Sequence, residues 1–363
     1  GAADRPVVFF SPNWTPIFTG ESINLTCNVD PPVQWNLLYT WYRDGNWIRG
    51  DQRSLVIRYA LVVDSGNYQC QAGGSERSDP VRLDVTGIDM ILQAPLFVHE
   101  GDFLSLRCHS RYSNRDPGIR FYKDDELIQS PVNGSVVNIG RVNVTASGTY
   151  TCERNNSNSI TLKPKVNITV TELFSRPQIK LNPSPVVQGE NMTVTCDTKP
   201  SPRGASTELQ FGFYRNGINV QGFYSSNQYR VPSAQLEDSG NYTCEVQTVT
   251  GSVRKRSNIE HIQIQKLFTV PQINVSPDPV ILEDHMTITC DIKPSPRGAT
   301  TELQIAFYRN GTNVQGFNSS NQYRVPSAQL EDSGNYTCMV QTSHGTVRKR
   351  SNILQIQIKG EFE

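Results

Sequence analysis

Short segments in which apolar and polar residues alternate recur along the whole chain. In residues 23–27, Ile, Leu and Cys alternate with Asn and Thr, and residues 192–196 repeat this alternation with Met, Val and Cys. Successive side chains of a β-strand point to opposite faces of its sheet, so each segment presents one apolar face to a core. Turn residues separate the segments, and no long helix is predicted. The pattern therefore predicts an all-β fold built from sandwich domains.

Eight cysteines divide the chain into regular parts. Taken in order they form four pairs whose members are 43, 44, 48 and 48 residues apart: Cys27 and Cys70, Cys108 and Cys152, Cys196 and Cys244, and Cys290 and Cys338. An even count at regular spacing predicts four disulfides formed in an oxidising compartment. In the chain-entropy model each such loop contributes about 4 kcal/mol to stability.

Aromatic residues accompany each pair of cysteines at fixed places. A tyrosine stands two residues before every second cysteine: Tyr68, Tyr150, Tyr242 and Tyr336. Another aromatic residue follows each first cysteine, at the place of the core residue of strand C: Trp41, Phe121, Phe213 and Phe307. A tyrosine corner and a core aromatic are typical of an immunoglobulin sandwich. We therefore expect tandem immunoglobulin-like domains of the C2 type, each with one intradomain disulfide.

Internal repetition indicates how many domains there are. Residues 225–244 and 319–338 are identical, and their surroundings also match with a period of 94 residues, which takes Cys196 to Cys290. Weaker copies fill the first half of the chain. This repetition indicates a duplicated domain in a series of four. From the cysteine positions we predict domains over residues 1–86, 87–172, 173–267 and 268–363.

Asparagine sequons support an extracellular location. Twelve Asn-x-Ser/Thr sequons predict glycosylation at Asn13, Asn24, Asn133, Asn143, Asn155, Asn167, Asn191, Asn241, Asn274, Asn310, Asn318 and Asn335. So many sequons beside paired cysteines indicate the secretory pathway. No apolar run is long enough to cross a membrane, and we expect any membrane anchor to lie outside this sequence. The chain is then a type I receptor ectodomain or a secreted protein.

Catalysis and cofactor binding have no support in the sequence. Five histidines, His99, His109, His261, His285 and His344, form no triad or metal-binding spacing. Lysine plus arginine balance aspartate plus glutamate at 34 each, so nothing favours a nucleic-acid partner. The basic runs at 254–256 and 348–350 are better explained as solvated strand edges than as sites for acidic ligands. We expect no enzyme activity, no metal and no cofactor.

Several longer motifs resemble one family, the Fc receptors and Fc receptor-like proteins of leukocytes. The first domain carries FTGESINLTC, the second LQAPLFVHEGDFLSLRCHS, and the last two FGFYRNGINVQG and IAFYRNGTNVQG with PSAQLEDSGNYTC. The resemblance covers essentially the whole chain. It implies a type I receptor of immune cells, with a sharp bend between the first two domains and protein ligands such as immunoglobulin Fc.

The resemblance also implicates two positions in ligand binding. In the family two tryptophans clamp a proline of the antibody, one four residues before QAP and one directly after CHS. Asp89 and Arg111 occupy these positions here. A carboxylate and a guanidinium do not reproduce the ring contacts of such a clamp. Asp89 and Arg111 are therefore candidate ligand-binding residues, but the aromatic mode of Fc binding is not expected.

We expect the ligand-binding surface in the first two domains, with the last two as a stalk. All four tryptophans, Trp14, Trp35, Trp41 and Trp47, belong to the first domain. Trp41 is expected in the core and Trp14 at the domain junction, whereas Trp35 and Trp47 fit either a binding hot spot or packing at strand ends. The leading hypothesis is a receptor that binds immunoglobulin Fc or a class I-like immune molecule. The alternative is an adhesion or spacer module with homophilic or other surface-protein contacts.

Overall fold

The computed structural model describes most of the chain. The described residues are 5–29, 38–111, 118–132, 135–155, 160–204, 207–296 and 301–360. Backbone contacts group the chain into two compact units, and the first of these joins Gly1–Arg176 with Thr198–Leu209 and Gln247–Arg254. Within the described ranges, no helix has the length and apolar character needed to cross a membrane.

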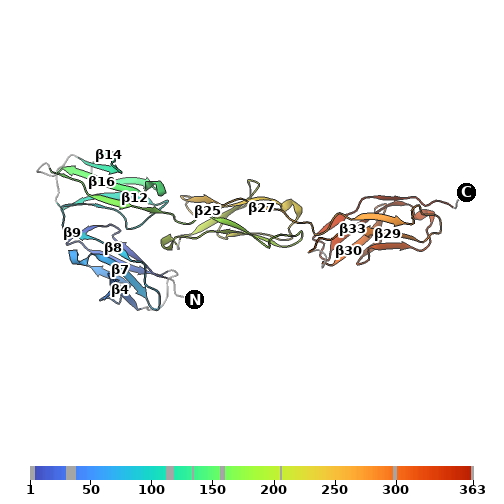
Figure 1. Ribbon diagram of the computed structural model, residues 1–363, viewed down its shortest axis with the longest axis horizontal. Helices are drawn as coiled ribbons and strands as arrows, with labels where there is room; N and C mark the ends of the chain where they lie inside the picture. The colour runs from blue at the N-terminus through green and yellow to red at the C-terminus, as the bar shows by residue number, and fades with distance from the viewer. Residues whose placement is uncertain are drawn as a thin grey trace. The chain divides into compact units, whose positions relative to one another are not determined.

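The first domain is a sandwich of two antiparallel sheets (Figure 1). One sheet contains, in spatial order, β1 (Val7–Ser11), β3 (Ile23–Asn28) and β6 (Ser54–Ile57). The other contains β5 (Asn46–Ile48), β4 (Tyr39–Arg43), β7 (Gly66–Ala72) and β8 (Val81–Leu83). A short parallel pair joins β2 (Ile17–Phe18) to β9 (Val85–Thr86), and the 3₁₀ turn η1 covers Val62–Asp64.

The second domain repeats this arrangement. Its first sheet contains β10 (Met90–Gln93), β12 (Phe103–Ser110) and β15 (Val136–Arg141). Its second sheet contains β14 (Glu126–Val132), β13 (Ile119–Lys123), β16 (Gly148–Asn155) and β17 (Thr161–Leu162), with β18 (Lys165–Ile168) also paired to β16. The parallel pair is β11 (Val98–His99) with β19 (Val170–Thr171), and η2 covers Val144–Ala146.

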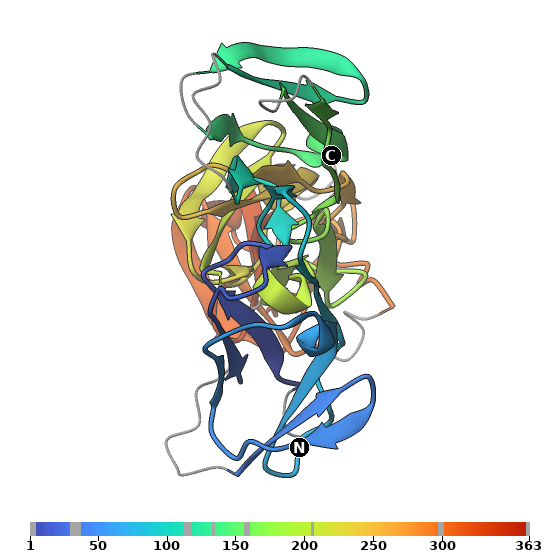
Figure 2. The ribbon, with the colours of Figure 1, turned by 90° about the vertical axis from the view of Figure 1, so that its left-hand side faces the viewer.

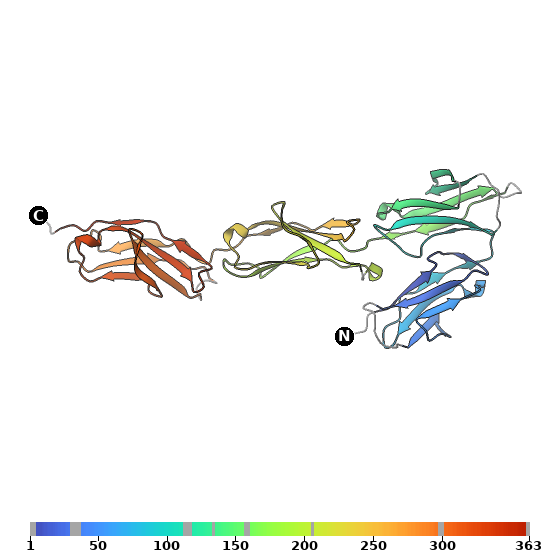
Figure 3. The ribbon, with the colours of Figure 1, turned by 180° about the vertical axis from the view of Figure 1, so that it is seen from behind.

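The third domain has the same two sheets, which Figure 3 shows from behind. The first contains β20 (Gln178–Asn182), β21 (Met192–Asp197) and β24 (Gln228–Val231). The second contains β23 (Ile218–Tyr224), β22 (Leu209–Arg215), β25 (Gly240–Thr248) and β26 (Arg254–Arg256), and β27 (Glu260–Ile262) pairs with β25. Two 3₁₀ turns, η3 and η4, cover Pro202–Gly204 and Leu236–Asp238.

The fourth domain copies the third strand by strand, each strand 94 residues later. Its strands are β28 (Gln272–Ser276), β29 (Met286–Asp291), β30 (Leu303–Arg309), β31 (Thr312–Asn318), β32 (Gln322–Val325), β33 (Gly334–Thr342), β34 (Arg348–Arg350) and β35 (Leu354–Ile356). The turn η6 covers Leu330–Asp332. Near-identical sequences therefore produce the same strand boundaries.

Each core lies between two sheets and is held by a disulfide. The four bonds join Cys27 to Cys70, Cys108 to Cys152, Cys196 to Cys244 and Cys290 to Cys338. The four predicted core aromatics are completely buried. Each corner tyrosine donates its hydroxyl to a backbone oxygen four residues upstream, as Tyr150 does to Ala146 at 2.6 Å. The all-β prediction of four domains with one disulfide each is confirmed.

Candidate binding surface of the first two domains

Asp89 and Arg111 lie side by side, but only one of the two side chains is directed to solvent. The Arg111 backbone N–H donates to the Asp89 carbonyl oxygen at 2.9 Å, beside the paired strands β10 and β12. The Arg111 guanidinium lies 5.0 Å from the ring centroid of Phe18 and donates to the hydroxyl of Thr19. Arg111 of the second domain is thus held against the first domain, where it makes a cation–π contact. The Asp89 side chain is exposed.

A small cluster extends this contact between the two domains. The His109 and Phe18 rings are 4.7 Å apart, and His109 Nε2 lies 3.4 Å from a carboxylate oxygen of Glu21. Burial lowers the pKa of His109, the nearby Arg107 lowers it further, and Glu21 opposes both effects. Alternation along β12 predicts that His109 faces away from its own core. That the first domain covers this outward face could not be predicted from the alternation.

Polar contacts complete the junction. Thr15 and Ala94 exchange backbone hydrogen bonds at 3.0 and 3.2 Å, and Gln93 Nε2 donates to the Pro16 carbonyl at 2.8 Å. Arg107 donates to Gln93 Oε1 at 2.7 Å and lies over the Trp14 ring at 5.7 Å. Trp14 therefore lies at the junction, as predicted. Figure 2 shows these two domains in blue to green.

An exposed apolar segment lies beside this junction in the first domain. We call Tyr59, Leu61, Val62 and Val63 the apolar turn, and their exposed fractions are 69%, 49%, 56% and 73%. Ala60, between them, is buried and exchanges backbone hydrogen bonds with Gly20 and Glu21 at 2.8 and 2.9 Å. Because Glu21 and its neighbours contact the second domain, the apolar turn is continuous with the junction.

Three of the four positions of this turn are polar in the duplicated domains, whereas Val62 corresponds to Leu236 and Leu330. Tyr59, Leu61 and Val63 correspond to Ser233, Gln235 and Glu237 of the third domain and to Ser327, Gln329 and Glu331 of the fourth. The alignment is fixed by Ala60, Ala234 and Ala328, which are all fully buried. A turn of this kind therefore does not need apolar side chains at the positions of Tyr59, Leu61 and Val63 in order to fold. We did not identify the apolar turn from the sequence, although a comparison of the repeats contains the signal.

The third domain also contributes to this region within the first compact unit. Arg203, in η3, donates to the Val8 carbonyl oxygen at 2.6 Å, and its guanidinium lies 3.4 Å from the Phe97 ring and 5.1 Å from the Phe9 ring. Burial lowers the pKa of Arg203 to about 10, although Asp79 raises it. The Arg203 side chain thus donates a hydrogen bond to the first domain and stacks on a ring of the second domain.

The other predicted residues are distributed over the surface. Trp47 is 65% exposed, as a hot spot requires, and Trp35 lies outside the described residues. Arg256 is paired with Glu245 at 2.7 Å, which agrees with a solvated strand edge. Asn133 and the side chain of Asn155 also lie outside the described part, and the asparagines of the other ten sequons are exposed. No group of three metal-binding side chains occurs among the residues that the structure describes.

Comparisons with known proteins identify the repeated unit. The family model described as an immunoglobulin domain matches residues 5–85, 89–170, 176–262 and 270–358. Human Fc receptor-like protein 4 is 28% identical over 99% of this chain and 70% of its own length. Human Fc receptor-like B is 30% identical over 70% of this chain and 61% of its own length.

The likeness to solved structures adds only a local match. The second Ig-C2 domain of human Fc-receptor like A is 33% identical over 25% of this chain and 98% of that chain, with a TM-score of 0.22. The chain spans 61% of the length of mouse Fc receptor-like protein 5 and 36% of the length of human Fc receptor-like protein 5.

Proposed function

Because the chain belongs to the immunoglobulin superfamily as an Fc receptor-like protein, we propose that it is the extracellular ligand-binding region of an immune cell-surface receptor. Its ligand is immunoglobulin Fc or a related immune protein of the class I-like kind, bound mainly through the first two domains. The third and fourth domains act mainly as a stalk.

The apolar turn is the observation that carries this proposal. Exposed apolar side chains at Tyr59, Leu61 and Val63 stand where two related turns of the same chain are polar. Exposed apolar patches of monomeric proteins often mark protein-interaction sites. Tyrosine is also enriched among residues that dominate binding energy. Since the turn adjoins the junction, a ligand that covers it also reaches Asp89, whose side chain is exposed.

The test exchanges the apolar turn for the turn of the third domain. In the triple variant Y59S/L61Q/V63E we expect affinity for the bound immunoglobulin to fall at least about tenfold, or about 1.4 kcal/mol. Surface plasmon resonance against each immunoglobulin class and against class I-like molecules provides the measurement. The double variant Y59F/V63I keeps the apolar character and should bind as the natural chain does.

Two results would contradict the proposal. Unchanged affinity in the triple variant would remove the apolar turn from the binding surface. Failure to bind every immunoglobulin and class I-like protein, together with concentration-dependent self-association in analytical ultracentrifugation, would favour the homophilic adhesion module instead. Circular dichroism and thermal unfolding of both variants would show that a loss of binding does not reflect a loss of fold.

A further inference from the structure

One pair of cross-strand positions recurs in all four domains, next to the corner tyrosine. We call it the F–G pair: the residue just before that tyrosine and the residue opposite it on a later antiparallel strand, which is β8, β18, β27 or β35. The four F–G pairs are Asn67 with Arg82, Thr149 with Asn167, Asn241 with His261, and Asn335 with Gln355. Residues directly opposite each other in an antiparallel pair have Cβ atoms about 5 Å apart. A group attached to either member therefore projects from nearly the same place.

A sequon occupies this pair in three of the four domains. In the third and fourth domains it is on the first strand of the pair, as Asn241-Tyr242-Thr243 and its copy at Asn335. In the second domain it is on the other strand, as Asn167-Ile168-Thr169. Duplication explains the agreement between the third and fourth domains. It does not explain the second domain, which reaches the same place from a different strand and with a different sequence.

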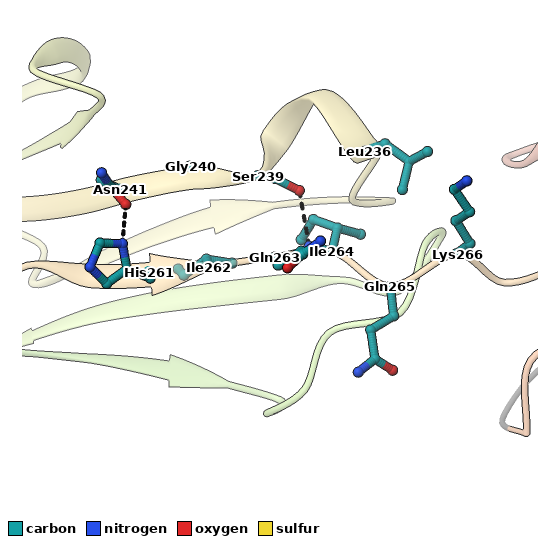
Figure 4. A pocket seen from close by; sticks show the side chains of 10 residues that line it. All are labelled: Leu236, Ser239, Gly240, Asn241, His261, Ile262, Gln263, Ile264, Gln265 and Lys266. Carbon is teal, nitrogen blue, oxygen red and sulfur yellow. Dashed lines mark hydrogen bonds between the residues drawn. The ribbon is translucent and has the colours of Figure 1, made fainter.

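In the second and third domains, the partner residue in the pair hydrogen-bonds the side chain of the asparagine. Thr149 Oγ1 donates to Asn167 Oδ1 at 2.8 Å, and the His261 ring hydrogen-bonds Asn241 Oδ1 through Nδ1 (Figure 4). Since Oδ1 is an acceptor, Nδ1 of His261 carries the proton in this bond. Both bonds engage the amide oxygen and leave the amide nitrogen Nδ2 for the sugar. The asparagines at positions 167, 241 and 335 are all exposed.

A groove beside Asn241 offers a surface for the attached sugar. Figure 4 shows Asn241 and His261 at one end of it and Lys266 at the other, with Leu236 and Ile264 between them. The groove thus combines apolar and polar groups, as the faces and hydroxyls of a sugar require. An occupant that is covalently attached at the rim is held at a high effective concentration, so weak contacts suffice to keep it in the groove.

We propose that the F–G pair is a shared glycan-attachment position of the second, third and fourth domains, so that sugar covers this face of each of them. In the transfer, Nδ2 forms a bond to C1 of the first N-acetylglucosamine of a lipid-linked oligosaccharide. The bond from C1 to the donor's pyrophosphate oxygen breaks, and the amide proton leaves with the pyrophosphate. In the first domain Asn67-Tyr68-Gln69 is no sequon, so that domain's pair stays bare and accessible to a protein ligand.

The first test is peptide-level mass spectrometry of the full chain secreted from mammalian cells. We expect glycan on Asn167, Asn241 and Asn335 in most molecules, and none on Asn67. Predominantly unmodified Asn167 or Asn241, in a preparation whose other sequons are modified, would overturn the proposal.

The second test moves the glycan across the pair. In N241Q we expect the segment 236–266 to be oxidised more by hydroxyl radicals than in the glycosylated natural chain. The natural chain should show the same increase after enzymatic deglycosylation. Adding H261N and Q263T to N241Q places the sequon on the other strand of the pair, as in the second domain. Protection of the segment 236–266 against oxidation should then return. N310Q removes a sequon elsewhere and should leave this segment unchanged. Equal oxidation with and without the Asn241 glycan would show that the sugar does not cover the groove.

Discussion

At the scale of single residues, the structure changes the role of a predicted contact. The sequence places Asp89 and Arg111 at the positions of an aromatic clamp, and the structure brings their backbones within hydrogen-bonding distance. The side chain of Arg111, however, is directed to Phe18 and Thr19. A residue that stabilises the junction can affect ligand binding without touching the ligand. Asp89 remains the better candidate for direct contact.

We expect two histidines to make the stability of this region depend on pH. Burial is the main cause that lowers the pKa values of His99 and His109; Arg203 acts in the same direction on His99, whereas Asp102 and Glu100 oppose it. As the pH is lowered, the two histidines therefore bind protons first in the unfolded chain, near the ordinary pKa of about 6.5. The free energy of unfolding should fall as the pH drops below that value and continue to fall down to the folded pKa values.

Chemical denaturation of the full chain at pH 7.5 and pH 5.5 measures this effect. The variant H99Q/H109Q should show a smaller loss of stability between the two pH values than the natural chain. H285Q, which replaces an exposed histidine of the fourth domain, should behave as the natural chain does. An equal loss in all three proteins would assign the pH dependence to other groups.

At the scale of elements, the positions of the strands can be predicted from the sequence far better than the contacts between domains. Alternation locates strands such as β3 and β21, because one face of each must meet a core. The corner tyrosines identify β7, β16, β25 and β33 in the same way. Surfaces that one domain presents to another carry no such periodicity. His109 and Arg203 have ordinary exposed-residue patterns in the sequence, and only the folded chain shows that other domains cover them.

The turn η3 provides the clearest test of such a contact. R203A removes a hydrogen bond to Val8 and a stacking contact with Phe97, which together should cost about 2 kcal/mol. F97L keeps an apolar side chain but removes the ring, so a loss of about 1 kcal/mol is expected. Thermal unfolding gives both values. R230A removes an exposed arginine bonded to Gln228 and serves as the control, and a similar cost in all three variants would exclude a specific role for Arg203.

At the scale of the whole molecule, these contacts define the smallest useful fragment. Residues 198–209 and 247–254 belong to the same compact unit as the first two domains. We therefore expect the fragment 1–267 to keep the full affinity of the chain, and 1–172 to bind more weakly because it lacks Arg203. The fragment 173–363 should not bind. Surface plasmon resonance of the three fragments tests this order, and full affinity in 173–363 would overturn the assignment of the last two domains as a stalk.

The identical segments 225–244 and 319–338 have a consequence for how the protein is made. Each contains one whole strand, the 3₁₀ turn and the first part of the strand that carries the second cysteine. A newly synthesised β21 therefore meets two chemically indistinguishable partners, tethered at an effective concentration of the order of millimolar. Pairing with the wrong copy gives strand-exchanged species, a known failure of repeated domains. We expect this error to be avoided when the third domain folds before the fourth leaves the ribosome.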